Sequence, residues 1–509
     1  MELELQKERF ECYRPGAVLV STSEESAETI VPDYCPDIAR IVNVSACLLL
    51  RSSTAADGRL AAEGAVRMTL LYLTEESRGL RAMEYSVPVE LNEKLPEICE
   101  DVSVEGRVCA VEARTLNPRK LFTRLTVEWK ATPYCRTTLT TCGEITQREQ
   151  YAIQTLCEQR DVSLIRAVSG KDFVFADEIT LPGGQDAIAE LLCPRVRLRV
   201  TEVKSIGSKA ILKGVACISL LYAGEGGKLC SYAEELPFSQ ILDGAAQDEG
   251  GETAASAVLN LSGFEIHTVG DGGEGRGVDV KLFLNAFVVM RSTQSVCCIT
   301  DLYSTEYDLD AQMEEVVLWQ KPETESVIQS VREQLDTGTE VKCVLGTDVC
   351  FGDAGIRRES DRAILHAAAN ISVLYLDESD APFSLERRVD VTAEAHISGD
   401  ASVSVEEVCA NDVSANINAN GLELRFPAEF RLVTASAPSC ACLTALRAEE
   451  REATDDAPSL VLRAPREDET LWDIAKQYRT TVEEILSANE LTESSTIELG
   501  QMLLIPRKR

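Results

Sequence analysis

Apolar and polar residues alternate along short runs that recur at a long period. Each run ends in a Leu-Tyr pair, and the tyrosines Tyr72, Tyr222 and Tyr375 are 150 and 153 residues apart. A polar turn follows each tyrosine, and a second alternating run follows the turn. Alternation with a period of two is typical of strands that bury one face. The pattern therefore predicts a strand–turn–strand unit that occurs three times.

A second hairpin is predicted after each of these units. Its turn is Asn117-Pro118 in the first copy and a glycine-rich segment, 270–277, in the second. The third copy has Asn420-Gly421, a dipeptide typical of tight hairpin turns. Each copy therefore has strands for sheets with one buried and one solvated face.

Short helices that begin at a proline are predicted ahead of the first two units, at 31–41 and 181–191, with a more degenerate third near 325–335. Together these elements predict a mainly β protein: three repeated β-rich, sandwich-like domains in series and a small α+β (βααβ) domain at the C-terminus. The predicted boundaries are 1–141, 142–300 and 301–445 for the β domains, 446–458 for a mobile acidic linker and 459–509 for the small domain.

The formal net charge of −34 belongs mainly to the predicted β domains. Negative charge of this size argues against nucleic acid and anionic membrane surfaces as partners, because both would repel it. The first residues lack the apolar core of a signal peptide, and no apolar run is long enough to predict direct membrane insertion. We therefore expect a cytoplasmic protein.

Cysteines are frequent, but their spacing does not indicate a metal site. The 18 cysteines include no Cys-x-x-Cys pair, and none of the three histidines has zinc-ligand spacing to a cysteine. Many cysteines lie in apolar, strand-like runs, among them Cys47, Cys109 and Cys217. Such residues behave as small buried hydrophobic side chains in a reducing compartment. No bound metal is predicted.

No catalytic motif stands out either. Residues 270–275 match the Gly-x-Gly-x-x-Gly string of dinucleotide sites, but they join two predicted strands and include two acids, so a hairpin turn is predicted. The metalloprotease motif His-Glu-x-x-His and the hydrolase motif Gly-x-Ser-x-Gly are absent. An enzyme would need a deep pocket in which His267, or His366 and His396, meet carboxylates. We therefore predict a protein that is not an enzyme and has no cofactor.

In the last fifty residues, the spacing of apolar residues changes to that of helices. Apolar residues at helical spacing predict two short helices, and alternation predicts an opening and a closing strand around them. Thr481 and Glu484 have the spacing of a capping box at the start of the second helix. Leu460 and Leu462 are predicted to face inward from the opening strand. These segments provide a small core of two helices on a two-stranded sheet.

This order of elements resembles a LysM module, with Asp-Glu-Thr-Leu at 468–471 and Ile-Glu-Leu-Gly-Gln at 497–501 in the family's two motif positions. In that family the ligand lies in a shallow groove between the two loops that carry these motifs. Where the family usually has glycine and proline, this chain has Asp468 and Leu499. The resemblance implies a partner- or glycan-binding groove formed by Asp468, Glu469, Thr470, Ile497, Leu499 and Gly500. Its ligand is either a protein or an N-acetylglucosamine-containing glycan.

Three β-rich units with a Leu-Tyr centre, followed by one LysM-like unit, are similar to the SPOCS-domain proteins of spore-forming clostridia, the SipL family. The resemblance implies a mother-cell cytoplasmic protein at the forespore surface. The resemblance implies two kinds of partner, the spore coat's morphogenetic ATPase scaffold protein and other coat proteins. It also implies a role as a non-enzymatic adaptor, which tethers the scaffold to the forespore through the LysM-like module. The alternative is a protein that binds peptidoglycan or cortex glycan through the same groove.

Overall fold

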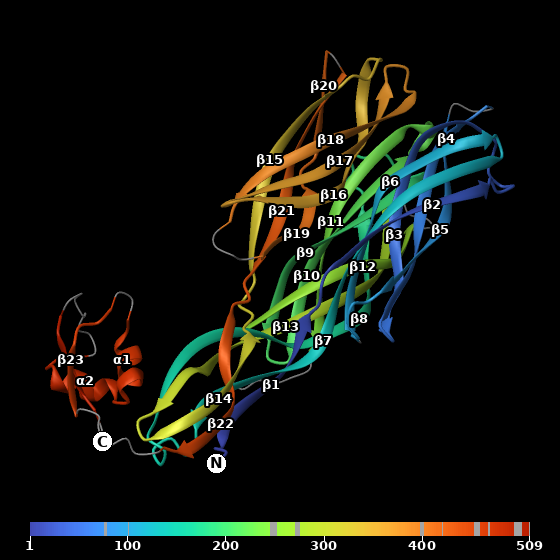
Figure 1. The fold of residues 1–509 in the computed structure, drawn as a ribbon. Coiled ribbons are helices and arrows are strands. Elements are labelled where there is room, and N and C mark those ends of the chain that lie inside the picture. The colour runs from blue at the N-terminus through green and yellow to red at the C-terminus, as the bar shows by residue number, and fades with distance from the viewer. Residues whose placement is uncertain are drawn as a thin grey trace.

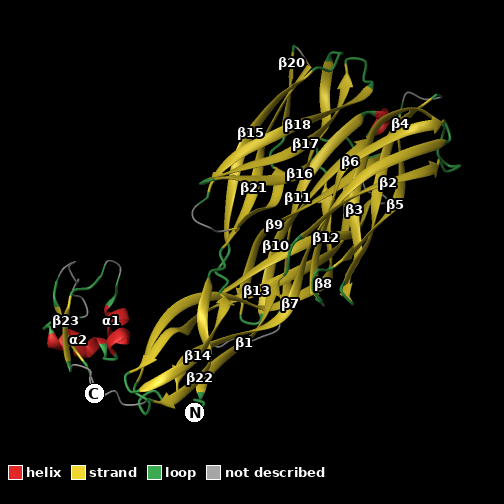
Figure 2. Ribbon diagram, in the orientation of Figure 1, coloured by secondary structure: helices red, strands yellow, loops and turns green. Residues whose placement is uncertain are grey.

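Strands make up most of the chain (Figure 2). The computed structural model describes residues 1–75, 79–99, 101–244, 252–269, 275–397, 402–419, 421–451, 459–466, 469–492 and 501–507. Within these ranges, helices occur only in the C-terminal module, which begins at residue 459, and in a short 3-10 turn, η1 (Glu225–Gly227). The predicted mainly β class, with a small α+β module at the C-terminus, is therefore confirmed.

Each copy of the repeat forms a three-stranded antiparallel sheet whose strands follow one another in sequence. The recurrent tyrosine lies near the end of the middle strand, as the alternation predicted. The strands are β3 (Ile38–Ala56), β4 (Arg59–Thr74) and β5 (Leu80–Lys94) in the first copy, β9 (Glu190–Ile206), β10 (Lys209–Ala223) and β11 (Leu229–Asp243) in the second, and β16 (Val341–Glu359), β17 (Arg362–Asp377) and β18 (Pro382–His396) in the third.

The second hairpin of each copy is also present. The second strand of each hairpin pairs antiparallel with the first. The first turn falls at Asn117-Pro118, as predicted, whereas residues 270–274 and Asn420 of the other two turns lie outside the described residues. The hairpins are β6 (Asp101–Asn117) with β7 (Lys120–Ile145), β12 (Thr253–Thr268) with β13 (Gly277–Ser304), and β20 (Ser414–Asn418) with β21 (Gly421–Ala435).

One seven-stranded sheet connects the first two copies. Its strand order is β12-β13-β8-β1-β7-β2, and β6 also pairs with β7. The strands not yet given are β1 (Leu5–Pro15), β2 (Leu19–Ile30) and β8 (Ile153–Thr180). β7 runs from Lys120 to Ile145 and β13 from Gly277 to Ser304, so strands of this sheet span the positions of the divisions proposed after residues 141 and 300.

The third copy adds two smaller sheets. One has the order β15-β21-β19 with β20 on β21, and the other pairs β14 with β22. Their bounds are β14 (Tyr307–Val317), β15 (Glu323–Leu335), β19 (Ser402–Ala410) and β22 (Ser439–Glu450). Since β22 continues to Glu450 and buries Leu446, the first residues of the predicted mobile linker are strand.

The first proline segment is a turn, not the predicted helix. Within it, the Cys35 amide donates to the Pro32 carbonyl at 2.9 Å. The Arg119 guanidinium, from the β6–β7 turn, donates to the carbonyl oxygens of Val31, Pro32 and Cys35 at 3.0, 3.1 and 2.6 Å. These bonds satisfy the carbonyls that a continuing helix would use. The segment is therefore held by a hairpin that lies far away in the sequence.

The second copy repeats this arrangement. The Gln185 amide donates to the Pro182 carbonyl at 2.9 Å, and Arg276 donates to the carbonyls of Pro182 and Gln185 at 2.9 and 2.8 Å. The third predicted helix is also wrong, because Glu323–Leu335 is the strand β15. Pairing with β21 along its whole length supplies the backbone hydrogen bonds of β15.

The three recurrent tyrosines are buried core residues, as predicted: Tyr72, Tyr222 and Tyr375. The Tyr222 hydroxyl donates to the Asp186 carbonyl, and the Tyr375 hydroxyl donates to the Thr337 carbonyl, each at 3.2 Å. Each bond ties the end of the middle strand to the segment that precedes the first strand of the same copy.

The leucine before each tyrosine points to the opposite face of its strand, because side chains alternate along a strand. Leu71, Leu221 and Leu374 are buried in one hydrophobic cluster, which we call the central cluster. Its other buried members are Val42, Leu80, Leu192, Cys193, Leu345 and Leu376. The three copies are in series along the chain, but in space their sheets share this core.

A buried amide also connects the three copies. Asn43, on β3 of the first copy, is 2% exposed. Its side-chain oxygen accepts from Arg195 of the second copy at 3.2 Å, and its nitrogen donates to the Ser372 hydroxyl of the third copy at 3.1 Å. A buried polar group needs such partners to offset its lost hydration. Asn43 therefore favours this one arrangement of the copies.

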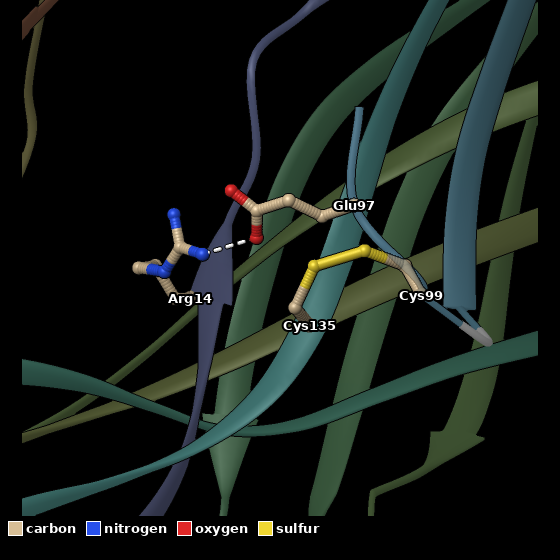
Figure 3. The surroundings of a disulfide bond; sticks show 4 residues. All are labelled: Arg14, Glu97, Cys99 and Cys135. Atoms are coloured by element: carbon tan, nitrogen blue, oxygen red, sulfur yellow. Dashed lines mark hydrogen bonds and ion pairs between the residues drawn. A yellow bond between two sulfur atoms is a disulfide. The ribbon is translucent and has the colours of Figure 1, made fainter. Parts of the chain in front are cut away.

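A disulfide joins Cys99, which follows β5, to Cys135 on β7 (Figure 3). Arg14 and Glu97 form an ion pair beside it. The sequence pattern did not indicate this bond, because the loop after β5 returns alongside a strand that is distant in sequence. The other cysteines of the chain are free thiols. Cys47, Cys109 and Cys217 are among them, but each is only half-buried, not buried as predicted.

Candidate functional site

The C-terminal module has the predicted order of strand, two helices and strand (Figure 1). Its elements are β23 (Leu460–Arg463), α1 (Leu471–Tyr478), α2 (Val482–Ala488) and β24 (Leu503–Pro506), and β23 pairs antiparallel with β24. The core consists of side chains that are fully buried, namely Ile474, Ala475, Ile485, Leu503 and Ile505.

The side chains of the opening strand, β23, face in the opposite directions from those predicted. Leu460 and Leu462 are 56% and 60% exposed, whereas Val461 between them packs on the core. Val461 pairs with Ile505, whose side chain is buried under the helices. Because the side-chain period of a strand is two, this pairing turns both leucines outward.

Both helices begin with a capping box. The predicted box of Thr481 and Glu484 is confirmed, and a second one joins Thr470 and Asp473 at the start of α1. The spacing Thr-x-x-Asp before an apolar run carries the same signal, because the acid at the third helical position can bond back to the cap.

Two of the six predicted groove residues lie in the described part of the chain. Asp468, Ile497, Leu499 and Gly500 lie outside it. Glu469 is paired with Arg463 and accepts from the Arg466 amide at 3.0 Å, with 14% of its side chain exposed. Thr470 is the N-cap of α1. Both side chains are therefore bonded within the module itself.

These bonds predict a pH dependence for the module. The Arg466 amide, and then Arg463, lower the pKa of Glu469 from its ordinary value. A carboxylate with a lowered folded pKa contributes stability above its unfolded pKa, about 4.3, and this contribution is lost as pH falls through the folded value. We expect hydrogen-exchange protection of the α1 amides in the full chain to decrease on acidification. Glu469→Gln should make this step smaller and leave the part due to Asp473, whose pKa is lowered by its hydrogen bonds from Thr470. Glu490→Gln, at an exposed acid, should leave the step unchanged, and equal pH profiles of wild type and Glu469→Gln would contradict the assignment of Glu469.

Tyr303, at the end of β13, attaches the module to the β body. Its hydroxyl donates to the Thr480 carbonyl at 2.7 Å in a buried hydrogen bond. Its ring meets Trp472 edge-on, with the ring centroids 4.9 Å apart. Tyr303 is 6% exposed and belongs to the same hydrophobic cluster as Ile474 and Ile485. The core of the module therefore continues into the body.

Charged contacts surround this aromatic pair. Asp301 accepts from the Trp472 indole at 2.8 Å and pairs with Lys476 at 2.5 Å, and Asp308 pairs with Arg479 at 2.6 Å. We call these contacts, together with those of Tyr303, the docking surface. On the module side, its residues lie on α1 and in the turn after it, whereas the described groove residues precede α1.

Of the three histidines, His267 lies in the wall of an open groove. His267 lines it together with Arg67, Glu84 and Glu265, and its volume is about 440 Å³. Arg67 donates to the Phe264 carbonyl at 2.9 Å and covers the Phe264 ring, so its contacts are structural. The groove is open and has both basic and acidic residues in its lining.

The residues that the structure describes contain no candidate metal site and no candidate membrane-spanning helix. Among them, no group of three His, Cys, Asp or Glu side chains is placed to hold a metal ion. None of their helices is long and apolar enough to cross a membrane. Residues 270–274 of the glycine-rich string lie outside the described ranges.

Two protein-family models match parts of the chain. One describes the LysM domain and matches residues 466–506; the other describes the SPOCS domain of SipL and matches residues 37–114. The chain carries a SipL-type SPOCS domain and a LysM domain. No curated protein and no solved structure matches it. The LysM domain coincides with the C-terminal module, and the SPOCS match covers β3 to β6.

Both are binding-type, non-catalytic domains. SipL-type proteins are linked to sporulation, and LysM domains typically bind N-acetylglucosamine-containing glycans. The two matches therefore place in one chain a domain type linked to sporulation and a domain type that typically binds glycans. The second and third copies repeat the three-stranded sheet of the matched SPOCS segment.

Proposed function

We propose that the protein is a non-enzymatic adaptor in endospore formation. It tethers the spore coat scaffold, a morphogenetic ATPase, to the forespore surface through its LysM domain, and it works in the mother-cell cytoplasm. The observation that carries this proposal is the attachment of a binding module to a large β body by Tyr303, Asp301 and Asp308. A ligand held by the LysM domain would thereby be joined to a rigid platform.

The position of the docking surface supports this role. Its LysM residues lie between Trp472 and Thr480, and the described groove residues, Glu469 and Thr470, lie before them. We infer that the LysM domain can be docked while its predicted groove binds a partner. Multiple scaffold copies in a coat layer would strengthen such binding through effective concentration.

Charge reversal at Asp468 tests the groove. We expect Asp468→Lys to reduce capture of the ATPase scaffold from sporulating cells about tenfold, the loss that corresponds to about 1.4 kcal/mol. Glu469 is unsuitable for this test, because its carboxylate is paired with Arg463 inside the domain. The bait is the full chain, and recovery of the scaffold is quantified by mass spectrometry.

The matched control is Asp390→Lys, at an exposed acid on β18. It changes net charge equally, so it should leave capture unchanged if the groove is responsible. Equal capture by wild type and Asp468→Lys would show that the groove assignment is wrong. A chain truncated at Pro458 should recover no scaffold; recovery by this truncated chain would show that the β body, not the LysM domain, binds it.

The second candidate function is binding of peptidoglycan or cortex glycan. It is favoured by the LysM match itself, because that domain class typically binds such glycans. Sedimentation of the full chain with purified peptidoglycan, competed by chitin oligomers, would support it. Capture of the scaffold that chitin oligomers do not compete would favour the adaptor.

A further inference from the structure

Two thiols meet on one face of the β8–β13 ladder, near the docking surface. Cys157 on β8 pairs with Ile299, and Cys297 on β13 pairs with Gln159, so the cysteines occupy diagonal positions on adjacent antiparallel strands. Their neighbour Cys298 points to the opposite face, where it is fully buried. Cys157 and Cys297 therefore share one face of the ladder, opposite to Cys298.

Gly143 of β7 provides the surface against which both thiols pack. The Cys157 thiol donates to the Gly143 carbonyl at 3.8 Å. A Cβ atom added at Gly143 would lie 3.0 Å from Cys297 Cβ and 3.5 Å from its sulfur. The missing side chain of Gly143 thus leaves the space that Cys297 occupies. Any larger residue would push Cys297 away from this position.

The two thiols differ in their access to solvent. Cys157 is exposed, whereas Cys297 is half-buried. Burial, and then the neighbouring Cys157 thiol with which it shares a hydrogen bond, raise the pKa of Cys297 to about 11. A small reagent in solution therefore meets Cys157 first, and Cys297 lies in position to react next.

The Cα atoms of Cys157 and Cys297 need to approach only slightly for a disulfide to form. Diagonal partners in a ladder have Cα atoms about 7–8 Å apart, and disulfides span about 4.4–6.8 Å. The register shift between Ile299 and Asp301 places a bulge next to the pair. A bulge bends its strand and increases the local twist, which gives the backbone room to move.

We propose that Cys157 and Cys297 are a reversible disulfide site that reacts with small-molecule disulfides. The Cys157 thiolate attacks one sulfur of the small disulfide, breaks its S–S bond and releases one small thiolate. The Cys297 thiolate then attacks the Cys157 sulfur of the mixed disulfide and releases the second small thiolate. Two electrons pass from the protein to the reagent, and the two cysteine protons end on the two released small thiols. Dithiothreitol reverses the reaction by the same exchange.

The test uses the full chain incubated with oxidised glutathione and then blocked with an alkylating reagent. We expect a cross-linked pair of tryptic peptides, one containing Cys157 and the other Cys297, and we expect dithiothreitol to remove it. Cys157→Ser and Cys297→Ser should each abolish the cross-link. Cys157 is exposed, so its serine variant tests the site without disturbing the core.

Two serine variants serve as controls. Cys298→Ser replaces the adjacent thiol on the opposite face, and Cys350→Ser replaces another exposed cysteine; both should keep the cross-link. A cross-link that survives Cys297→Ser but is lost in Cys298→Ser would overturn the proposal. So would a stable mixed disulfide of glutathione on Cys157 with Cys297 still open to alkylation.

Discussion

Leu71→Ala is expected to lower the free energy of unfolding of the β body by about 2–5 kcal/mol, the cost of truncating a buried leucine. Leu71 is fully buried in the central cluster, where Leu221 and Leu374 of the other copies pack against the same core. The removed methyl groups leave a cavity that three sheets share. Urea unfolding followed by circular dichroism gives the change in midpoint, and hydrogen exchange shows which copies lose protection.

Leu116→Ala is the matched control, because Leu116 lies on β6 and is 46% exposed. Its expected cost is within about 0.5 kcal/mol, as for most surface substitutions. The shared core also predicts that Leu71→Ala lowers protection in all three copies. Loss confined to the first copy would show that the copies are energetically independent.

Tyr303→Ala is expected to release the LysM domain from the β body. The substitution removes a buried ring that packs on Trp472, together with the hydroxyl that bonds the Thr480 carbonyl. Truncation of a large buried aromatic side chain costs about 3–5 kcal/mol of stability. Exposed ion pairs, such as that of Asp308 with Arg479, contribute too little free energy to offset this loss. Small-angle X-ray scattering should show a larger radius of gyration, and proteases should cut faster between Glu450 and Ser459.

Two other tyrosine variants serve as controls for Tyr303→Ala. Tyr303→Phe keeps the ring and removes only the buried hydrogen bond, so its expected cost is about 1 kcal/mol and docking should persist. Tyr34→Ala removes a tyrosine that is 84% exposed, and it should leave scattering unchanged. Unchanged scattering and proteolysis of Tyr303→Ala would show that the docking surface does not hold the domain.

The predictions that succeeded depend on local pattern. Alternating residues around Tyr72, Tyr222 and Tyr375 correctly indicated the repeated hairpins, because strand alternation reflects one buried face regardless of the neighbouring strand. The capping box at Thr481 and Glu484 was found because both partners lie within one helical turn.

The predictions that failed depend on distant partners. The segment after Val31 is a turn because Arg119, far along the chain, binds its carbonyls. Val461 faces inward because of its pairing with Ile505. Of the groove, the structure describes Glu469 and Thr470, and their bonds inside the domain were missed. The docking role of Tyr303 had no sequence signal, because a tyrosine at a strand end is ordinary.

The sequence by itself determined the β class, the threefold repeat and the helical character of the C-terminal module, since period and capping are properties of neighbouring residues. Only the tertiary structure decided that Leu71, Leu221 and Leu374 meet in one core, that Cys99 pairs with Cys135, and that the LysM domain is docked through Tyr303. These contacts join segments that are far apart in the chain. Their free energy depends on which surfaces meet in space, and that information is not contained in any local pattern.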